Sequence, residues 1–471
     1  MDFNPKSKFV QIKIEDHKKL LTNGKSDLSL NDILSSEKCQ CIISECREFR
    51  ARIYTPLKTL LMFIKQMLNP DKSCKNAVAG SVAEQISLGE KASSTNTGPY
   101  SKARERLPEV AVKELVKETG ELTANKAPSK WKWRGHDVKL VDGTNVTMPD
   151  TKENQEAFLR HNNHAGEVGF PMARLVVIMS LAVGTIIGYA IGASKGKGTG
   201  EHSLLRSILN CIKGGDLLLG DCYYPSFFLI ADLLSRGADG LFPGLNGRNY
   251  DFRKGEHLGK NDHIVEWRKP TRPEWMDKQT YDAYPKQIRI REFKVSRRIY
   301  VTTLLDDKKY NKKELAALYE FRWQVELKIR DIKITMNMEM LSCKTPEMVR
   351  KEIGIHFLGY NLIRILIAEA CTRHDFIPYQ ISFKGTVQLL NQFIPYFSKS
   401  IKHTNRNEEL LSELLRLIVQ NKVANRPGRL EPRAVKSERR KTFRTMKRAR
   451  IVEKWRLERK REKRILRYAN S

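Results

Sequence analysis

The chain has 471 residues, of which 40% are apolar, so it is long enough for several domains and too apolar to be disordered throughout. Its 85 Lys and Arg outnumber 54 Asp and Glu, and the formal charge of +31 indicates a polyanionic partner. Nucleic acid is the simplest such partner, and an anionic membrane surface is the other option. The eight cysteines are scattered without zinc-site spacing, which favours reduced thiols over structural zinc or a disulfide framework.

The first part of the chain, residues 1 to about 128, has the pattern of a helical region. It contains apolar runs such as RIYTPLKTLLMFIKQML, interrupted by the polar and basic segment GEKASSTNTGPYSKARERLP. The first residues lack the apolar core of a signal peptide. We therefore expect a helical N-terminal region over residues 1–130 that contributes to binding the polyanion.

From Trp131 the pattern changes to short, strongly apolar runs that predict a buried sheet. DVKLVDGT, residues 137–144, is the first predicted strand. The uncharged stretch LVVIMSLAVGTIIGYAIGA, 175–193, has the crude length of a membrane span, but it is rich in β-branched residues and is divided by Gly184 and Thr185. We therefore expect two strands, about 173–182 and 185–193, joined by a tight turn, and no membrane partner.

Alternating helices and strands follow. We expect a helix over 200–212, a strand over 215–224, a helix over 225–237 that begins at its proline, and a strand over 238–245. The polar segment 246–305 contains alternating patterns that predict antiparallel strands, and an apolar packing helix, EIGIHFLGYNLIRILIAEACTR, comes later. Three strands, helix, strand, helix, strand, insertion and helix is the order of an α/β, ribonuclease H-like core with a β-rich insertion.

Acidic residues end two of the predicted buried strands. Asp142 ends VKLVD and Asp221 ends DLLLGD. One such Asp is usually a cap or turn residue, but two on neighbouring strands, with Glu326 on a later helix, form a rarer set. Converging carboxylates repel one another unless cations neutralise them, and their hard oxygen ligands suit Mg²⁺ or Mn²⁺.

The segment LYEFRWQVELKIRDIK, residues 318–333, has helical spacing but an unusual surface. At about 100° per residue, four polar residues share an arc of roughly 60°: Tyr319, Arg322, Glu326 and Lys333. Apolar residues flank this arc on both sides, so water is scarce there. The alternative is an ordinary surface Arg–Glu pair at i,i+4 with solvated neighbours. Periodicity alone leaves both interpretations open.

The carboxylate set supplies a chemical reason for this arc. Two metal ions about 4 Å apart can activate an attacking hydroxyl and stabilise the leaving oxygen of an in-line phosphoryl transfer. Arg322 and Lys333, beside Glu326 on the helix, would hold the neighbouring phosphates. The residues therefore indicate metal-dependent chemistry on a nucleic acid backbone.

These residues resemble a known signature. The spacing Tyr319-(2)-Arg322-(3)-Glu326-(6)-Lys333 matches the Y-(2)-R-(3)-E-(6)-K signature of insertion-sequence family four, a group of bacterial DDE transposases. LVDGT around the first Asp, GDCYYPSFF around the second and the β-rich insertion before the Glu strengthen the match. The resemblance covers about residues 131–370. One departure is Cys222, where many relatives carry an Arg, and it leaves the local phosphate contact open.

The resemblance implies a DNA transposase with a ribonuclease H-like core and a catalytic D, D, E set. Asp142, Asp221 and Glu326 would be the catalytic and metal-binding residues, with Mg²⁺ as cofactor and Mn²⁺ as a substitute. Tyr319, Arg322 and Lys333 would contact DNA. The partners implied are double-stranded DNA, as transposon terminal inverted repeats and target, and a second copy of the chain. Cut-and-paste transposition through hairpin intermediates, in the bacterial cytoplasm at the nucleoid, would be the corresponding activity.

Two other functions remain open: a metal-dependent DNA nuclease on the same core, and an inactive DNA-binding protein derived from a transposase.

Trp267 and Trp275 in the insertion would either stack on an extruded base or pack within the insertion. Residues 426–467 carry nineteen Lys and Arg against five Glu, which suits a phosphate-binding tail or a solvated segment. The expected division after residue 130 is 131–245 (core), 246–305 (insertion), 306–400 (final catalytic and packing helices) and 401–471 (basic helical region).

Overall fold

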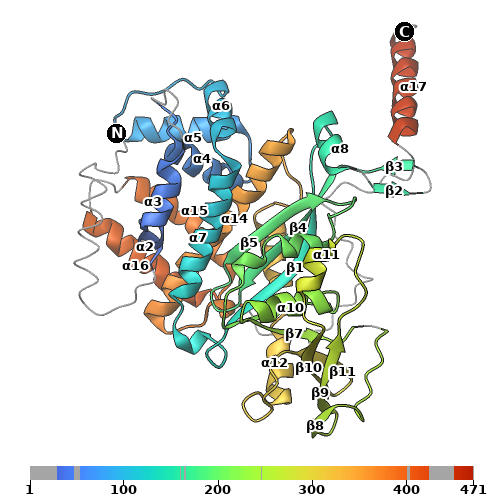
Figure 1. Cartoon of the computed structure of the whole chain (residues 1–471). Helices are drawn as coiled ribbons and strands as arrows, with labels where there is room; N and C mark the ends of the chain where they lie inside the picture. The colour runs from blue at the N-terminus through green and yellow to red at the C-terminus, as the bar shows by residue number, and fades with distance from the viewer. Residues whose placement is uncertain are drawn as a thin grey trace.

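The computed structural model describes residues 29–46, 53–159, 161–163, 166–245, 247–399, 404–423 and 450–469. Within these ranges, helices from both ends of the chain gather on one side of a large sheet, and the strands of residues 256–302 extend the sheet away from them (Figure 1). The helical group and the sheet share one apolar core, so the N-terminal helices pack directly against the part of the chain that carries the acidic residues.

The central feature is a nine-stranded sheet with the order β5-β4-β1-β6-β7-β11-β10-β9-β8. The pairs β1–β6 and β6–β7 are parallel, and the other neighbouring strands are antiparallel. The first five strands of this order form the mixed sheet that the sequence predicted for a ribonuclease H-like core. The strands are β1 (Asp137–Thr147), β4 (Met172–Ser180), β5 (Ile186–Ala193), β6 (Asp216–Leu219), β7 (Asp239–Pro243), β8 (Glu256–Gly259), β9 (Asp262–Arg268), β10 (Gln287–Val295) and β11 (Arg298–Thr302).

The uncharged stretch 175–193 forms two antiparallel strands, β4 and β5, as predicted. Gly184, with φ +77°, lies in the connection between them, where a side chain would be strained and would clash with the guanidinium of Arg364. The hairpin is buried, so its lack of charge reflects packing on both faces of the sheet.

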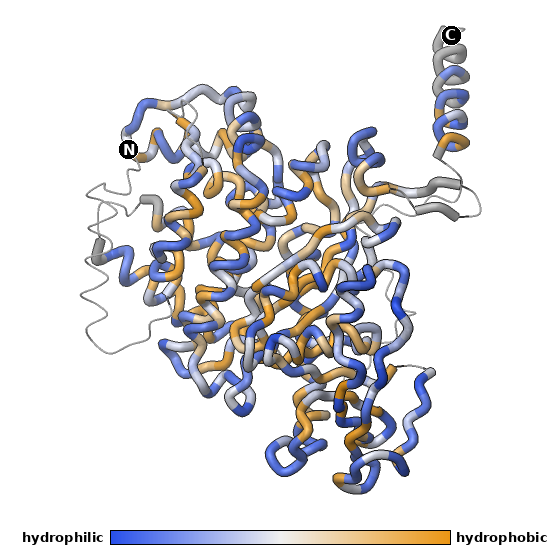
Figure 2. Tube along the Cα trace, viewed as in Figure 1, coloured by the Kyte–Doolittle hydropathy of each residue, from blue (hydrophilic) through white to orange (hydrophobic). Residues whose placement is uncertain are grey.

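Successive residues of β1 face two different cores. Leu140 belongs to the core beneath α7 and α14, and Val141 belongs to the core beneath α9 and α10. Figure 2 shows the apolar part of the chain concentrated in the sheet and in these helices. Because both faces are covered, the central strands are mostly apolar, and the charged Lys139 and Asp142 in the interior of β1 are exceptions. The helices are α7 (Glu109–Asn125), α9 (Glu201–Arg206), α10 (Phe227–Ser235) and α14 (Pro346–His374).

The helix α14 is the centre of the helical group. It contacts α4, α7, α15 and α16. Its most apolar stretch of 18 residues is 94% buried inside the protein. Length and composition alone would allow this helix to cross a membrane, but its burial makes it a core helix. The other helices of this group are α2 (Leu30–Leu34), α3 (Glu37–Ser44), α4 (Pro56–Leu68), α5 (Cys74–Ser87), α6 (Gly98–Arg106), α15 (Phe383–Lys399) and α16 (Thr404–Gln420).

The predicted insertion forms β8 to β11 and α11 (Lys278–Ala283), and β11 pairs with β7, so its strands continue the central sheet. Its two tryptophans differ. Trp267 is 3% exposed and donates to Glu292 Oε1 at 2.8 Å, so it packs within the insertion. Trp275 is 55% exposed, with the Arg206 guanidinium 3.9 Å from the ring centroid.

The last described segment stands apart from the body. After α8 (Lys152–Phe158), the hairpin of β2 (His161–Asn163) and β3 (Gly166–Val168) extends outward, and α17 (Arg450–Ala469) contacts β3 (Figure 1). Most of the basic segment 426–467 lies outside the described residues, and only its part in α17 is placed.

Several local expectations about helices are wrong. The helix expected over 200–212 ends at Arg206, and a separate 3-10 turn covers Leu209–Cys211. Residues 318–333 do not form one helix: α12 (Lys312–Glu320) and α13 (Trp323–Arg330) are separated by a tightened turn, and a π-helical turn, η3 (Asp331–Thr335), follows. At the junction of α12 and α13, the amides of Phe321 and Arg322 donate to carbonyls three residues earlier. In the π-helical turn, the amide of Met336 donates to the carbonyl of Asp331, five residues earlier. A uniform angle of 100° per residue therefore does not hold. In α10, Ser226 is the N-cap, so Pro225 precedes the helix.

Candidate active site

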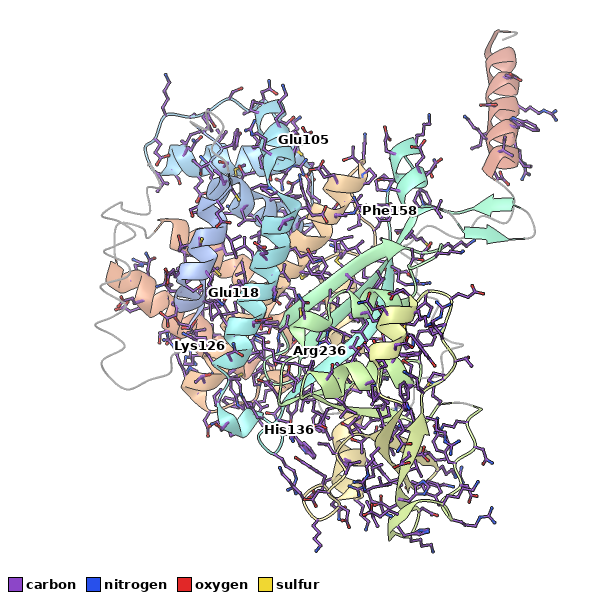
Figure 3. The ribbon with its side chains drawn as sticks, in the orientation of Figure 1. Glu105, Glu118, Lys126, His136, Phe158 and Arg236 are labelled. Atoms are coloured by element: carbon purple, nitrogen blue, oxygen red, sulfur yellow. The ribbon has the colours of Figure 1, made fainter. Side chains whose placement is uncertain are left out.

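The two aspartates lie side by side because β1 and β6 are parallel. Leu140 is paired with Leu219, and Asp142 and Asp221 each come two residues later. The path of β1 is visible in Figure 3, which labels His136 just before the strand and Phe158 in α8 beyond its other end. The carboxyl ends of parallel strands meet at the same edge of a sheet, where side chains from different strands converge.

Asp142 is a half-buried carboxylate whose Oδ1 accepts from the Gly143 amide at 2.9 Å. Burial raises its pKa to about 6, and the nearby carboxylates of Glu326 and Asp221 raise the pKa as well. The Gly143 amide and the Arg322 guanidinium act in the opposite direction. These interactions put Asp142 within electrostatic reach of the other two acidic residues and of Arg322.

Asp221 follows β6 in a tight turn. Its Oδ1 accepts from the Tyr223 amide at 2.8 Å, which is the geometry of an Asx turn. The strand ends at Leu219, earlier than the predicted 215–224, so Asp221 is on the loop that follows the strand. Tyr224, three residues on, is buried and anchors this loop in the core below α10.

Glu326 reaches the same place from α13, which contacts β1. Its Oε1 accepts from Arg322 Nη2 at 2.6 Å, with the two side chains 34% and 15% exposed. The i,i+4 pair foreseen as the alternative interpretation is therefore formed, but both its members are half-buried beside Asp142. A pair in such surroundings is more strongly coupled than an exposed one.

The two remaining residues of the signature differ in position. Tyr319 is 6% exposed, and its hydroxyl donates to the Gly220 carbonyl at 3.2 Å, so it joins α12 to the loop of Asp221. Lys333 is half-buried on the π-helical turn and forms no ion pair within the part of the chain that the structure describes. The structure thus gathers Asp142, Asp221, Glu326, Arg322 and Tyr319, and among the described contacts none joins Lys333 to this group.

The donor set fits a hard divalent cation, because all three acidic groups offer carboxylate oxygens and Asp142 is destabilised by its acidic neighbours. Among the described residues, no three acidic, His or Cys side chains are close enough to hold one ion as they lie. Arg322 supplies the positive charge next to Glu326 in this arrangement.

One further carboxylate, Glu201 at the start of α9, lies next to β1 and was not singled out by the sequence. Its carboxyl group lies against Gly143, and Tyr224 donates to its Oε2 at 3.2 Å. An acidic residue in the first turn of a helix is common, so no signal in the sequence distinguished it.

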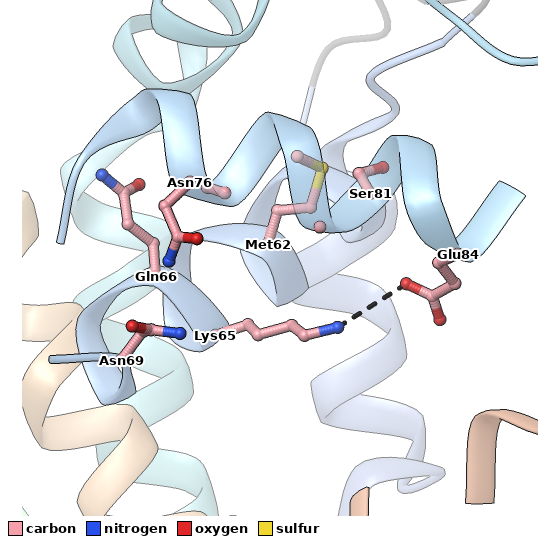
Figure 4. Close-up of a pocket in the computed structure, with 9 residues that line it drawn as sticks. Met62, Lys65, Gln66, Asn69, Asn76, Ser81 and Glu84 are labelled. Atoms are coloured by element: carbon pink, nitrogen blue, oxygen red, sulfur yellow. Dashed lines mark ion pairs between the residues drawn. The ribbon is translucent and has the colours of Figure 1, made fainter. Parts of the chain in front are cut away.

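A separate pocket of about 90 Å³ lies between α4 and α5 (Figure 4). Lys65 and Glu84 form an ion pair of 3.7 Å across it. Residues 62–84 line this pocket and none of the acidic residues above belongs to it, so it is a feature of helix packing away from the carboxylates.

Comparison with known proteins gives a family resemblance. A family model described as a transposase DDE domain matches residues 133–362, a range that contains Asp142, Asp221 and Glu326. The transposase InsG for insertion sequence element IS4 of Escherichia coli strain K12 is 28% identical over 344 residues, which cover 71% of this chain and 75% of that protein. Together with the signature and the mixed sheet, these similarities identify residues 133–362 as a match to a transposase DDE domain, and the chain resembles the DDE transposases of insertion-sequence family four.

Proposed function

We propose that the chain cuts and joins the ends of an insertion sequence by metal-dependent phosphoryl transfer, with Asp142, Asp221 and Glu326 as its metal ligands. The observation that carries this proposal is the parallel β1–β6 register, which brings two aspartates together beside the half-buried Arg322–Glu326 pair. A pair of divalent cations bound there would polarise the scissile phosphate and activate the attacking hydroxyl. The protein's part is to hold three carboxylates at fixed positions around them.

Arg322 has two roles in this proposal. In the protein alone it neutralises Glu326, and on DNA its planar fork would bind the phosphate beside the scissile one. Since Arg322 also stabilises the ionised form of Asp142, its charge acts on two of the three proposed ligands. Lys333, half-buried on the π-helical turn, would contribute a positive charge to a more distant phosphate.

Tyr319 requires a different role from the DNA contact expected from the signature. Its buried hydroxyl already donates to Gly220, and little of the side chain is accessible to a bound duplex. We assign it to positioning: it fixes the loop of Asp221 relative to the helix pair that carries Arg322 and Glu326.

The proposed DNA partners are the terminal inverted repeats and the target, bound by a dimer, in the bacterial cytoplasm at the nucleoid. The charge of +31 and the basic segment 426–467 support extensive phosphate contact. If cleavage proceeds through hairpins, the exposed Trp275 is the better candidate than the buried Trp267 for stacking on an extruded base. Removal of residues 426–471 should flatten the slope of log affinity against log salt concentration, and an unchanged slope would show that this segment does not contact DNA.

A strand-transfer assay tests the function. The purified protein is incubated with Mg²⁺ and linear DNA carrying the inverted repeats that flank its gene, and joined products are separated from cut ones. Joining of ends to a target supports transposition, and hydrolysis without joining would support the nuclease alternative. DNA binding without any metal-dependent cleavage would identify an inactive DNA-binding protein. The intact set of three carboxylates favours the first outcome.

A further inference from the structure

The loop that carries Asp221 is held by hydrogen bonds from two helices outside it. Before Asp221, the Gly220 carbonyl accepts from the hydroxyl of Tyr319 on α12 at 3.2 Å. After Asp221, the Tyr223 carbonyl lies 2.7 Å from Nε2 of His202 on α9. A carbonyl oxygen can only accept, so this ring nitrogen is the donor. The loop is therefore fixed on both sides of the aspartate.

The hydrogen bond from His202 leads directly to the carboxylate of Asp221. Tyr223, whose carbonyl accepts from His202, donates its own amide to Asp221 Oδ1 at 2.8 Å. The backbone of one residue thus joins the imidazole to the carboxylate. Burial lowers the pKa of His202, and the Asp221 carboxylate acts in the opposite direction, so the ring lies within electrostatic reach of that carboxylate.

His202 itself is firmly placed. It lies in the first turn of α9, whose Leu204 and Leu205 are buried, and α9 contacts β4 and β5. The half-buried imidazole packs on the ring of Tyr223, with centroids 4.7 Å apart, and on the ring of Tyr224, 5.8 Å away. The first turn of α9 therefore links the loop to the central sheet.

The loop needs such a link, because strand pairing does not fix Asp221. The strand β6 ends at Leu219, and Tyr223 at the turn is 55% exposed. A carboxylate on an unanchored loop would lose conformational freedom when it bound a cation, and that loss would weaken binding. Hydrogen bonds that orient a ligand beforehand reduce this cost.

We infer that His202 is a positioning residue of the proposed site: it holds the Tyr223 peptide so that Asp221 keeps the orientation in which it binds a divalent cation. This inference rests on the proposed function, because it presumes that Asp221 is a cation ligand. The ring nitrogen that faces the loop already donates to a carbonyl, so His202 acts on the loop and not on the cation itself.

The test compares two substitutions of similar length at His202. Gln can still donate from its amide to the Tyr223 carbonyl, whereas Met has no donor. Binding of Mn²⁺ to the full chain is measured by calorimetry without DNA, and cleavage is measured over a range of Mg²⁺ concentrations. We expect His202→Met to lose about 10- to 100-fold in Mn²⁺ affinity and to need more Mg²⁺ for half-maximal cleavage. His202→Gln should retain most of both.

Thermal unfolding in EDTA separates positioning from a general loss of structure. The matched control is His374→Met, at an exposed histidine that ends α14, which should bind Mn²⁺ as the unaltered chain does. If His202→Met is less stable but keeps its Mn²⁺ affinity, its role is only structural and the inference is wrong. Equal losses of affinity in His202→Gln and His202→Met would also contradict it, because the donor would then be irrelevant. If His202→Met does not fold, His202→Phe, which keeps a ring on Tyr223, serves as the variant without a donor.

The failure of this inference is distinguishable from the failure of the proposed function. If Asp221→Asn weakens Mn²⁺ binding and His202→Met does not, the proposed site stands and the inference is wrong. If Asp221→Asn leaves both Mn²⁺ binding and cleavage unchanged, Asp221 is not a ligand, and the proposed site is wrong together with the inference.

Discussion

The proposed site is built from two regions of unlike rigidity. Asp142 lies within β1, two residues after its last pair with β6, and Asp221 lies on the loop after β6, so the parallel pairing of these strands fixes their spacing. Glu326 lies on α13, a helix of eight residues between a tightened turn and a π-helical turn. Irregular helical turns leave backbone hydrogen bonds that are more easily rearranged than a strand ladder. The sheet therefore sets the site, and the helical segment is the part that can adjust to cation and DNA.

The far end of the helical segment is nevertheless anchored. Leu341 donates to the Thr147 carbonyl at 2.9 Å, and Thr147 donates to the Glu339 carbonyl, so the chain after η3 continues along the end of β1. Lys72 of the N-terminal helical region donates to the Asn337 carbonyl at 2.6 Å. Adjustment of Glu326 is thus confined to α13 and its two turns.

The largest effects are expected from the three proposed metal ligands. Asp142→Ala, Asp221→Ala and Glu326→Gln should each lower the cleavage rate by about a thousandfold or more, because several kcal/mol of transition-state stabilisation depend on the bound cation. DNA binding, measured by gel shift, should survive in all three. Cleavage at the unaltered rate by any of them would remove that residue from the proposed set.

A smaller loss is expected from Arg322, which pairs with the proposed ligand Glu326. Arg322→Ala should reduce cleavage about 100-fold through loss of the phosphate contact, without raising the Mg²⁺ concentration for half-maximal activity. Arg322→Lys should stay impaired, since it keeps the charge and loses the planar fork. A sharply higher Mg²⁺ requirement would mean that Arg322 serves mainly to orient Glu326. The control is Arg298→Ala, which breaks the exposed Arg298–Glu320 pair and should leave cleavage unchanged.

The rigid region should also show the stability cost of its function. Burial and acidic neighbours raise the pKa of Asp142 to about 6. Ionising this carboxyl group at pH 7 therefore costs more free energy in the folded protein than in the unfolded chain. Asp142→Asn should therefore raise the free energy of unfolding in EDTA by about 1 to 3 kcal/mol, with a smaller gain at pH 5. Urea unfolding measures this, and destabilisation by the substitution would show that the protein already satisfies the carboxylate.

The same contrast explains what the sequence could predict. The core strands follow from short apolar runs, and the structure confirms their order along the chain and the mixed sheet. The prediction that the two aspartates end their strands is wrong: β1 continues to Thr147, beyond Asp142, and β6 stops at Leu219, before Asp221. The break between α12 and α13 was not predictable from periodicity, because Tyr319 bonds to Gly220 and Phe321 packs on Tyr379, partners distant in sequence. The contact of Glu201 with Gly143 is likewise visible only in three dimensions.

The smallest predicted effect concerns the anchor at Asn337. Burial lowers the pKa of Lys72 to about 8, against the opposing charges of Glu352 and Cys343, and its ammonium also faces His356 Nε2 at 3.2 Å. Between pH 8 and the ordinary lysine range near 10.5, the unfolded chain holds a proton that the folded chain has released. Stability should therefore rise with pH across this window, relative to a Lys72→Met variant that lacks the group. Urea unfolding of both proteins at pH 7.5, 8.5 and 9.5 measures the difference, and parallel pH profiles would contradict the lowered pKa. Cleavage at pH 7.5 should change only a few-fold in Lys72→Met, because Thr147 still holds the chain beyond η3 and the carboxylates of the sheet are untouched.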